Sequence, residues 1–382
     1  MKARIKGQDL RFWKLFGVFR KHLQQASAGH PSRLDLPHPS RHLDSTEYLS
    51  LWLLAMVNPV IDSMRGLCQA SHLEKVQEQL QTHRVSLGSF SEAQQVLNLS
   101  LLPEVYQSLR EALPVQGNQD NPSWPENIQL VDSSLWEAVG RMNWAQWRHQ
   151  HKTQRAVRVH VSFNLLEDRP ENMTITPGRV CERAVLKEKV KPGEFYVGDR
   201  NYGRDHRLLN LMQVKGCPFI FRILHQLEPV LEEELPLSAQ DRAAGVVADA
   251  WVRLGTRPRD GTVCMRRMEV LAEAGEKIVL LTNQGPEILS AASVAAIYKA
   301  RWRIELFFKW IKSILGNRHF LAHSPAGVAI QMYMALIAAL LLQHFTRKRP
   351  GKRQMEMIQF YLMGWASLEE LTPRLGLIPN PV

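Results

Sequence analysis

Four polar side chains recur at helical spacing in the last third of the sequence. They are Tyr298, Arg301, Glu305 and Lys312, in the segment YKARWRIELFFKWIK. At about 100° per residue, these positions fall within an arc of about 60° on one helix. The carboxylate could bind a metal ion, and the cations beside it could bind phosphate groups. A charged stripe by itself is more often only the solvated side of an amphipathic helix.

Two aspartates follow short apolar runs that are typical of strands. Asp132 ends the run NIQLVD, and Asp199 follows the run EFYVG. A carboxylate at the end of a strand has its backbone fixed by the sheet, while its oxygens project beyond the sheet edge. An isolated Asp in this position is more often an ordinary turn residue. Together with Glu305 the two aspartates form three carboxylates, and such hard oxygen ligands suit Mg²⁺ or Mn²⁺.

Three motifs contain these residues: Leu-Val-Asp132-Ser-Ser, Gly-Asp199-Arg-Asn-Tyr-Gly203, and Y-x2-R-x3-E-x6-K from Tyr298 to Lys312. In type and order they resemble the DDE transposases of bacterial insertion sequences, specifically the IS-four group with its YREK signature. The resemblance covers about residues 85–345. It implies an α/β fold with a ribonuclease-H-like mixed-sheet catalytic core, which a β-rich insertion interrupts between the second Asp and the Glu.

The resemblance also implies a chemistry, which is metal-dependent cleavage of DNA strands followed by strand transfer. Asp132, Asp199 and Glu305 would be the catalytic residues and would hold two Mg²⁺ (or Mn²⁺) ions about 3.5 to 4 Å apart. One ion would activate a water or a DNA 3′-hydroxyl, and the other would stabilise the leaving oxygen.

Other residues of the motifs are expected to bind DNA. By the resemblance, Tyr298, Arg301 and Lys312 would grip phosphates beside the scissile bond. Arg200, which follows the second aspartate, would orient a metal ligand or touch DNA.

Three tryptophans carry separate expectations. Trp251 lies in the expected insertion, where family members that cut through a DNA hairpin use an aromatic residue to hold a flipped base. An equally open interpretation makes Trp251 a core residue of an amphipathic strand. Trp302 and Trp310, in the YREK segment, are expected to pack against the rest of the protein.

Charge also indicates a polyanionic partner. The chain has 48 Lys and Arg against 37 Asp and Glu, a net charge of +11, of which +9 lies between Tyr298 and Phe360 and +5 in the first 50 residues. Such a surplus favours nucleic acid. We therefore expect double-stranded DNA, at element ends and at the target, with a homodimer in the synaptic complex. Two alternatives stay open: a catalytically silent DNA-binding remnant or regulator, and a divalent-metal nuclease without strand transfer.

Periodicity and turn composition divide the chain into five segments. We expect a helical DNA-binding region over 1–120, core parts at 121–223 and 291–345, a β-rich insertion over 224–290, and a C-terminal basic tail over 346–382. Apolar spacing predicts helices from Leu10 to Leu23 and around Leu49–Met56, and the turn-rich segment Pro114–Pro125 marks the first boundary. A capping-box pattern at Ser89–Glu92 and Pro103 predict two helix starts.

Within the core, alternation and apolar runs predict strands that alternate with helices. The strands are expected at 127–132, 156–165, 173–176, 194–198 and 218–223, and the helices at 181–190 and 205–214. From Ser290 one helix should continue to about Gly316, and a buried apolar helix should follow over Ala326–Leu342.

Composition excludes several classes of protein. With 45% hydrophobic and 22% charged residues, the chain belongs with folded globular proteins. Its four cysteines form no C-x-x-C pair, so neither a zinc site nor a disulfide framework is indicated, and a reducing compartment fits. The longest apolar stretch has about 17 residues, fewer than the roughly 20 of a spanning helix. No signal peptide is evident. We therefore expect a cytoplasmic bacterial protein without a membrane partner.

Overall fold

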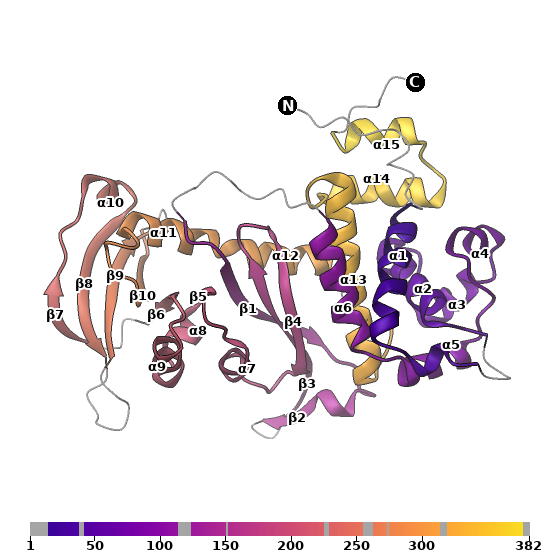
Figure 1. Ribbon diagram of the computed structural model, residues 1–382, viewed down its shortest axis with the longest axis horizontal. Helices are drawn as coiled ribbons and strands as arrows, with labels where there is room; N and C mark the ends of the chain where they lie inside the picture. The colour runs from indigo at the N-terminus through magenta and orange to yellow at the C-terminus, as the bar shows by residue number, and fades with distance from the viewer. Residues whose placement is uncertain are drawn as a thin grey trace. The chain divides into compact units, whose positions relative to one another are not determined.

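A computed structural model describes residues 14–37, 42–113, 124–149, 152–224, 229–254, 263–272, 275–313 and 319–376 (Figure 1). The chain divides into two compact units. The helical unit contains Met1–Gln116, Glu137–Trp144 and Lys309–Val382, and the sheet unit contains Gly117–Trp136 and Ala145–Phe308. The chain therefore passes from one unit to the other at four points.

The helical unit consists almost entirely of short helices. They are α1 (Lys14–Gly29), η2 (Arg33–Asp35), α2 (Ser45–Val57), α3 (Met64–Ala70), α4 (Glu74–Leu80), α5 (Leu87–Val96), α6 (Leu101–Ala112), α13 (Pro325–Thr346), α14 (Lys352–Met363) and α15 (Leu368–Arg374). The helical character expected for residues 1–115 is thus confirmed for the described part, whereas the pattern over residues 10–13 and most of the boundary at 114–123 lie outside the described residues.

The core of the helical unit forms around α13. This helix packs against α1, α2, α5 and α6, because its apolar residues surround it on all sides and need neighbours on all sides. It is the one described helix long and apolar enough to cross a membrane, but 78% of its most apolar window is buried within the protein. The buried helix expected over Ala326–Leu342 is confirmed. Its contacts group it with the N-terminal helices.

The sheet unit is built on ten strands. They are β1 (Ile128–Glu137), β2 (Gln146–His149), β3 (Lys152–Asn164), β4 (Arg169–Pro177), β5 (Phe195–Gly198), β6 (Phe219–Ile223), β7 (Val230–Glu234), β8 (Val246–Leu254), β9 (Val263–Leu271) and β10 (Lys277–Thr282). Their order is β2-β3-β1-β5-β6-β10-β9-β8-β7, and β4 pairs with β3. The pairs β1·β5 and β5·β6 are parallel, and β3·β4 is antiparallel. The expected α/β class with a mixed sheet is confirmed.

Short helices lie between β4 and β6 along the chain. These are α7 (Glu182–Lys189), α8 (Arg200–Gly203) and α9 (His206–Val214), which contact one another, and α8 also contacts β6 (Figure 1). Beneath them lies an apolar core that includes Val131, Tyr196, Phe219 and Phe221. The strands and helices expected between residues 156 and 223 are therefore present, with ends shifted by a few residues.

The β-rich insertion extends the core sheet. Its last strand, β10, pairs antiparallel with β6, with Val279 opposite Ile223. Strands β9, β8 and β7 continue outward from β10, and helix α10 (Ala239–Ala243) joins β7 to β8. The expectation of a β-rich segment is confirmed, and the segment shares one sheet with the catalytic core.

Two local expectations are wrong. The cap of α5 is Ser86, whose Oγ accepts a hydrogen bond from Ser89 N at 3.1 Å, so the helix begins three residues before the expected start. The strand that contains Asp132 does not end there, because β1 continues to Glu137 beside β3. An Asp that ends an apolar run resembles a turn residue, but here the strand continues past it.

Candidate active site

The register of two neighbouring parallel strands brings Asp132 and Asp199 together. The last paired residues of β1 and β5 are Val131 and Gly198, and each aspartate is the next residue along its chain. Because adjacent strands lie about 4.8 Å apart, the two aspartates lie side by side where the pairing of β1 with β5 ends. Pairing between distant segments, which no local pattern specifies, thus joins the two motifs.

Asp132 is held in a largely buried, negatively charged environment. Its Oδ1 accepts a hydrogen bond from Ser133 N at 2.7 Å. The pKa of Asp132 is raised to about 7, chiefly by burial and in part by the nearby carboxylates of Asp199 and Glu182, while the Ser133 hydrogen bond and the Arg301 guanidinium oppose the rise. The site therefore favours whatever supplies positive charge, whether a proton or a cation.

Asp199 caps the short helix that follows β5. Its Oδ1 accepts a hydrogen bond from Asn201 N at 2.9 Å. Two glycines allow this turn to lie close to the sheet, since an added Cβ would come within 2.8 Å of the Tyr202 ring at Gly198 and within 2.3 Å of Arg222 O at Gly203. The motif Gly-Asp-Arg-Asn-Tyr-Gly therefore specifies a tight strand-to-helix turn that fixes the second aspartate.

The YREK segment is two helices, not the single helix expected. Helix α11 (Ala291–Ala300) ends at Arg301, and α12 (Trp302–Ser313) begins after it. Arg301 itself keeps a right-handed helical backbone, with φ −53° and ψ −29°, so the four side chains are divided between two consecutive helices. Tyr298 lies on α11, and Glu305 and Lys312 lie on α12. The helical periodicity of the sequence could not predict this break, because Arg301 is compatible with either helix.

Arg301, at this break, lies between two of the candidate catalytic carboxylates. Its Nη2 donates to Glu305 Oε1 at 2.6 Å, and its Nη1 is 4.0 Å from Asp132 Oδ2. The guanidinium also lies over the ring of Tyr298, with Cζ 5.7 Å from the centroid. Burial raises the pKa of the Tyr298 phenol. The structure therefore brings together Asp132, Asp199, Tyr298, Arg301 and Glu305.

A further carboxylate, Glu182, was missed by sequence reasoning. It is buried at the first turn of α7. Its Oε2 accepts a hydrogen bond from Ser133 Oγ, and its Oε1 accepts one from Asn201 Nδ2. Arg158 Nη1 lies 3.7 Å from Glu182 Oε2 and donates to Ser133 Oγ at 2.9 Å. Glu182 thus connects the segment after Asp132 to the segment after Asp199. Only its place at a helix start hinted at any role.

The remaining predicted residues lie in several environments. Arg200 is exposed at the start of α8, and Trp251 is half-buried on β8, opposite Glu233 of β7 and Arg266 of β9. Burial lowers the pKa of Lys312. Trp310 is buried, and its Nε1 donates to Pro350 O, as expected for a packing residue. Trp302 is 57% exposed, so the expectation that it packs is wrong.

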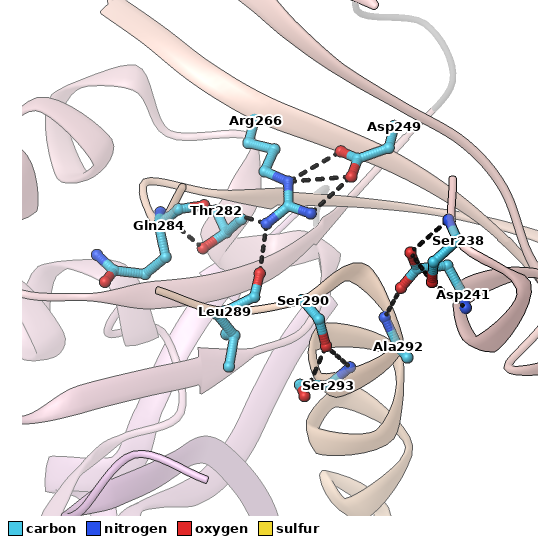
Figure 2. A network of polar contacts seen from close by, with 10 residues as sticks. All are labelled: Ser238, Asp241, Asp249, Arg266, Thr282, Gln284, Leu289, Ser290, Ala292 and Ser293. Atoms are coloured by element: carbon cyan, nitrogen blue, oxygen red, sulfur yellow. Dashed lines mark hydrogen bonds and ion pairs between the residues drawn. The ribbon is translucent and has the colours of Figure 1, made fainter. Parts of the chain in front are cut away.

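A buried polar network fixes the start of α11 (Figure 2). Arg266 of β9 and Asp249 of β8 form an ion pair in which both side chains are almost wholly buried, with Nη2 2.6 Å from Oδ2. Arg266 Nη1 also donates to Leu289 O, just before the helix. Asp241 of α10 accepts a hydrogen bond from Ala292 N at 2.7 Å. The insertion therefore holds the helix that carries Tyr298.

Hard oxygen ligands are present, but the described residues contain no group of three or more His, Cys, Asp or Glu that is already gathered for a metal ion. Asp132 and Asp199 are close enough to influence each other, while Glu305 is paired with Arg301. The donor set, three carboxylates with surplus negative charge around Asp132, fits a divalent cation of the Mg²⁺ type.

The chain belongs to the family of transposase DDE domains, whose model matches residues 123–341. It is therefore a DDE-type, transposase-family protein. It is 29% identical to a protein named transposase y4zB of Sinorhizobium fredii, over 56% of this chain and 60% of that protein. It is 26% identical to a protein named as the transposase of insertion sequence element IS5377 of Geobacillus stearothermophilus, over 58% of this chain and 57% of that protein.

A third relative matches over more of its length. It is named as the transposase of insertion sequence element IS4SA of Synechocystis sp., and it is 23% identical over 83% of this chain and 87% of that protein. A solved structure, a piggyBac transposase synaptic complex with hairpin DNA, superposes with a TM-score of 0.44 at 10% identity, over 96% of this chain and 81% of that one. The chain spans less than two thirds of the length of the first two relatives.

Proposed function

We propose that this protein is a DNA transposase, which binds the terminal inverted repeats of an insertion sequence, cleaves the DNA strands and joins them to a target. The observation that carries the proposal is the placement of Asp132 beside Asp199 at the end of the β1·β5 pairing, with Arg301 between Asp132 and Glu305. The family match supports the same reaction class. Membership of the IS-four group stays a prediction.

In this proposal Asp132, Asp199 and Glu305 hold two divalent ions, Mg²⁺ or Mn²⁺. When bound, such ions supply a nucleophilic oxygen and stabilise the leaving oxygen during displacement at phosphorus. Arg301 keeps Asp132 and Glu305 oriented and reduces the repulsion between them. Its guanidinium also suits a bidentate contact with a phosphate. Tyr298 supports the guanidinium from below with its ring.

The proposed partner is double-stranded DNA, bound by two copies of the protein in the synaptic complex, in the bacterial cytoplasm. Lys312 and Arg200 would contact phosphates, as the charge surplus of +9 between Tyr298 and Phe360 favours. Trp251, half-buried on β8, keeps part of its indole available for stacking on a flipped base.

The test uses a duplex that carries the inverted repeats flanking the coding region, with a labelled target duplex and MgCl₂. Wild-type protein should nick the element end and join it to the target. Asp132→Ala, Asp199→Ala and Glu305→Ala should each abolish both steps and leave end binding largely intact. Nicking without joining would establish the nuclease alternative. Binding without nicking would establish the silent remnant.

A further inference from the structure

A short β-ribbon lies at the end of the core sheet, outside every motif discussed above. Strand β2 pairs antiparallel with the first four residues of β3, with Gln146 opposite Arg155 and Arg148 opposite Thr153. Beyond these four residues, β3 continues into the core and pairs with β4 from Val157 onward. Figure 1 shows β2 beside the start of β3. The ribbon is therefore an extension of a strand that is itself firmly held.

The ribbon carries positive charge without any negative charge. Residues 138–166 contain five Lys or Arg and three His but no Asp or Glu. Arg148, Lys152 and Arg155 are all exposed. Among the described residues, no carboxylate forms an ion pair with any of the three. By contrast, exposed Arg253 of β8 pairs with Glu232 of β7.

The alternation of side chains places two of these cations on one face. In an antiparallel pair, directly opposite residues share a face, so Arg148 and Arg155 project to the same side, on diagonal positions about 7 to 8 Å apart. Arg155 Nε donates to Gln146 Oε1 at 3.0 Å, which fixes the guanidinium while its other N–H groups remain available. Lys152 projects to the opposite face.

The base of the ribbon is packed tightly enough to hold it in place. Trp147 lies against Gly178, where an added Cβ would come within 2.8 Å of the indole. Gly178 N donates to Ala156 O at 2.8 Å. The cations therefore sit on a strand pair that is fixed at one end, which reduces the entropy lost when they bind a partner.

We infer that the ribbon formed by Gln146–His149 and Lys152–Arg155 binds the phosphate backbone of duplex DNA. The inference rests on the proposed function and adds a contact surface that the YREK segment does not include. Planar guanidinium groups suit phosphate oxygens. Among the ribbon residues whose side chains the structure describes, the exposed ones are Arg, Lys, Gln and Thr, and Trp147 is half-buried against Gly178, so none is the exposed aromatic or aliphatic anchor that a protein partner would need. Backbone contacts of this kind are independent of base sequence.

The experiment compares the salt dependence of DNA binding by the full chain. The probes are two fluorescent duplexes of roughly 30 base pairs, one with the terminal repeat and one with an unrelated sequence, each titrated over a series of KCl concentrations. The variants are Arg148→Ala/Arg155→Ala and the charge-retaining Arg148→Lys/Arg155→Lys. The matched control is Arg207→Ala/Lys215→Ala, which removes the same charge from exposed positions on and just after α9 in the same unit.

Loss of two phosphate contacts should reduce the slope of log K against log [KCl] by about 2, and equally on both duplexes. The Lys variant should restore most of the slope, and the control should keep it. A wild-type slope in the Ala variant would overturn the ribbon contact and leave the proposed function intact, as would a loss confined to the terminal-repeat duplex. Absence of DNA binding by the wild-type protein would instead overturn the proposed function itself.

Discussion

Glu182 is the residue whose role the sequence concealed most completely. It accepts hydrogen bonds from Ser133 and from Asn201. Ser133 directly follows Asp132, and Asn201 lies two residues after Asp199. A buried carboxylate in this place holds both aspartate-bearing segments in position. A small error in the position of a catalytic group can cost about 100-fold in rate. Glu182 is therefore a positioning residue of the proposed active site.

Removal of Glu182 should separate catalysis from binding. We expect Glu182→Ala to reduce single-turnover nicking by about 100-fold and to weaken Mn²⁺ binding, measured by titration of the protein alone, while DNA affinity stays unchanged. Glu182→Gln keeps a carbonyl acceptor and should retain an intermediate rate. Glu167→Gln, which disturbs the ion pair of Glu167 with Arg169 instead, is the control. Nicking by Glu182→Ala at the wild-type rate would show that the hydrogen bonds of Glu182 to Ser133 and Asn201 do not contribute to catalysis.

His160, on β3, should make the sheet unit sensitive to acid. It is buried and its Nε2 lies 2.9 Å from Thr176 Oγ1. Burial, with a smaller effect from Arg158, lowers its pKa from 6.5 to about 4. Between pH 4 and pH 6.5 the unfolded chain therefore binds more protons than the folded protein. The contribution of neutral His160 to stability is complete above pH 6.5 and is lost as the pH falls toward 4.

At pH 5 the preferential protonation of His160 in the unfolded chain lowers the unfolding free energy by about 2 kcal/mol. Urea unfolding of wild-type protein and of His160→Gln at pH 7.5 and pH 5 measures it, because glutamine cannot be protonated and can still bond to Thr176. The wild-type protein should lose about 2 kcal/mol more than the variant. Equal losses in the two proteins would mean that His160 is protonated as readily in the folded state as in the unfolded one.

At the scale of elements, the insertion holds α11 through a buried ion pair. Replacing Arg266 by Ala would leave Asp249 buried and unpaired and would remove the hydrogen bond to Leu289 O. Loss of one partner of a buried pair costs about 3 to 5 kcal/mol. We expect Arg266→Ala to lose that amount in chemical unfolding and to slow nicking, since α11 carries Tyr298.

The exposed pair of Arg253 with Glu232 provides the comparison, because it is also formed between strands of the insertion. Arg253→Ala should change the unfolding free energy by less than about 1 kcal/mol. Arg266→Met, which removes the charge but keeps much of the volume, should also destabilise the protein, because Asp249 stays unpaired. Full stability in Arg266→Met would show that packing, and not the charge pair, holds α11.

The elements show which features local sequence can predict. Alternation and apolar runs located β3, β5, β6, α7 and α9 well, because each is specified by its own side chains. The break at Arg301 and the continuation of β1 past Asp132 depend on neighbouring elements, and neither changes the periodicity of the segment. The bridge through Glu182 depends on three segments that are distant in sequence. Motif spacing identified the candidate carboxylates, whereas only the strand register shows that two of them adjoin.

At the scale of the whole molecule, each compact unit is assembled from segments that are not consecutive in the sequence. Helix α13 follows the YREK segment in sequence but packs against α1, α2, α5 and α6 in the helical unit. Its uniform apolar surface predicted burial correctly but could not indicate which neighbours would cover it. The helical unit therefore takes its core from one end of the chain and most of its remaining helices from the other.

If the two units unfold independently, the effect of a destabilising substitution in α13 should be confined to the helical unit. Leu336 is fully buried in α13, and Leu336→Ala should destabilise the helical unit by about 2 to 5 kcal/mol. Hydrogen exchange should then accelerate in α1, α2, α6 and α13, while amides of β1, β5 and β6 keep their wild-type rates. Val197→Ala on β5 should give the reverse pattern. Equal acceleration throughout the chain in either variant would show that both units unfold in one step, despite the separate clustering of their contacts.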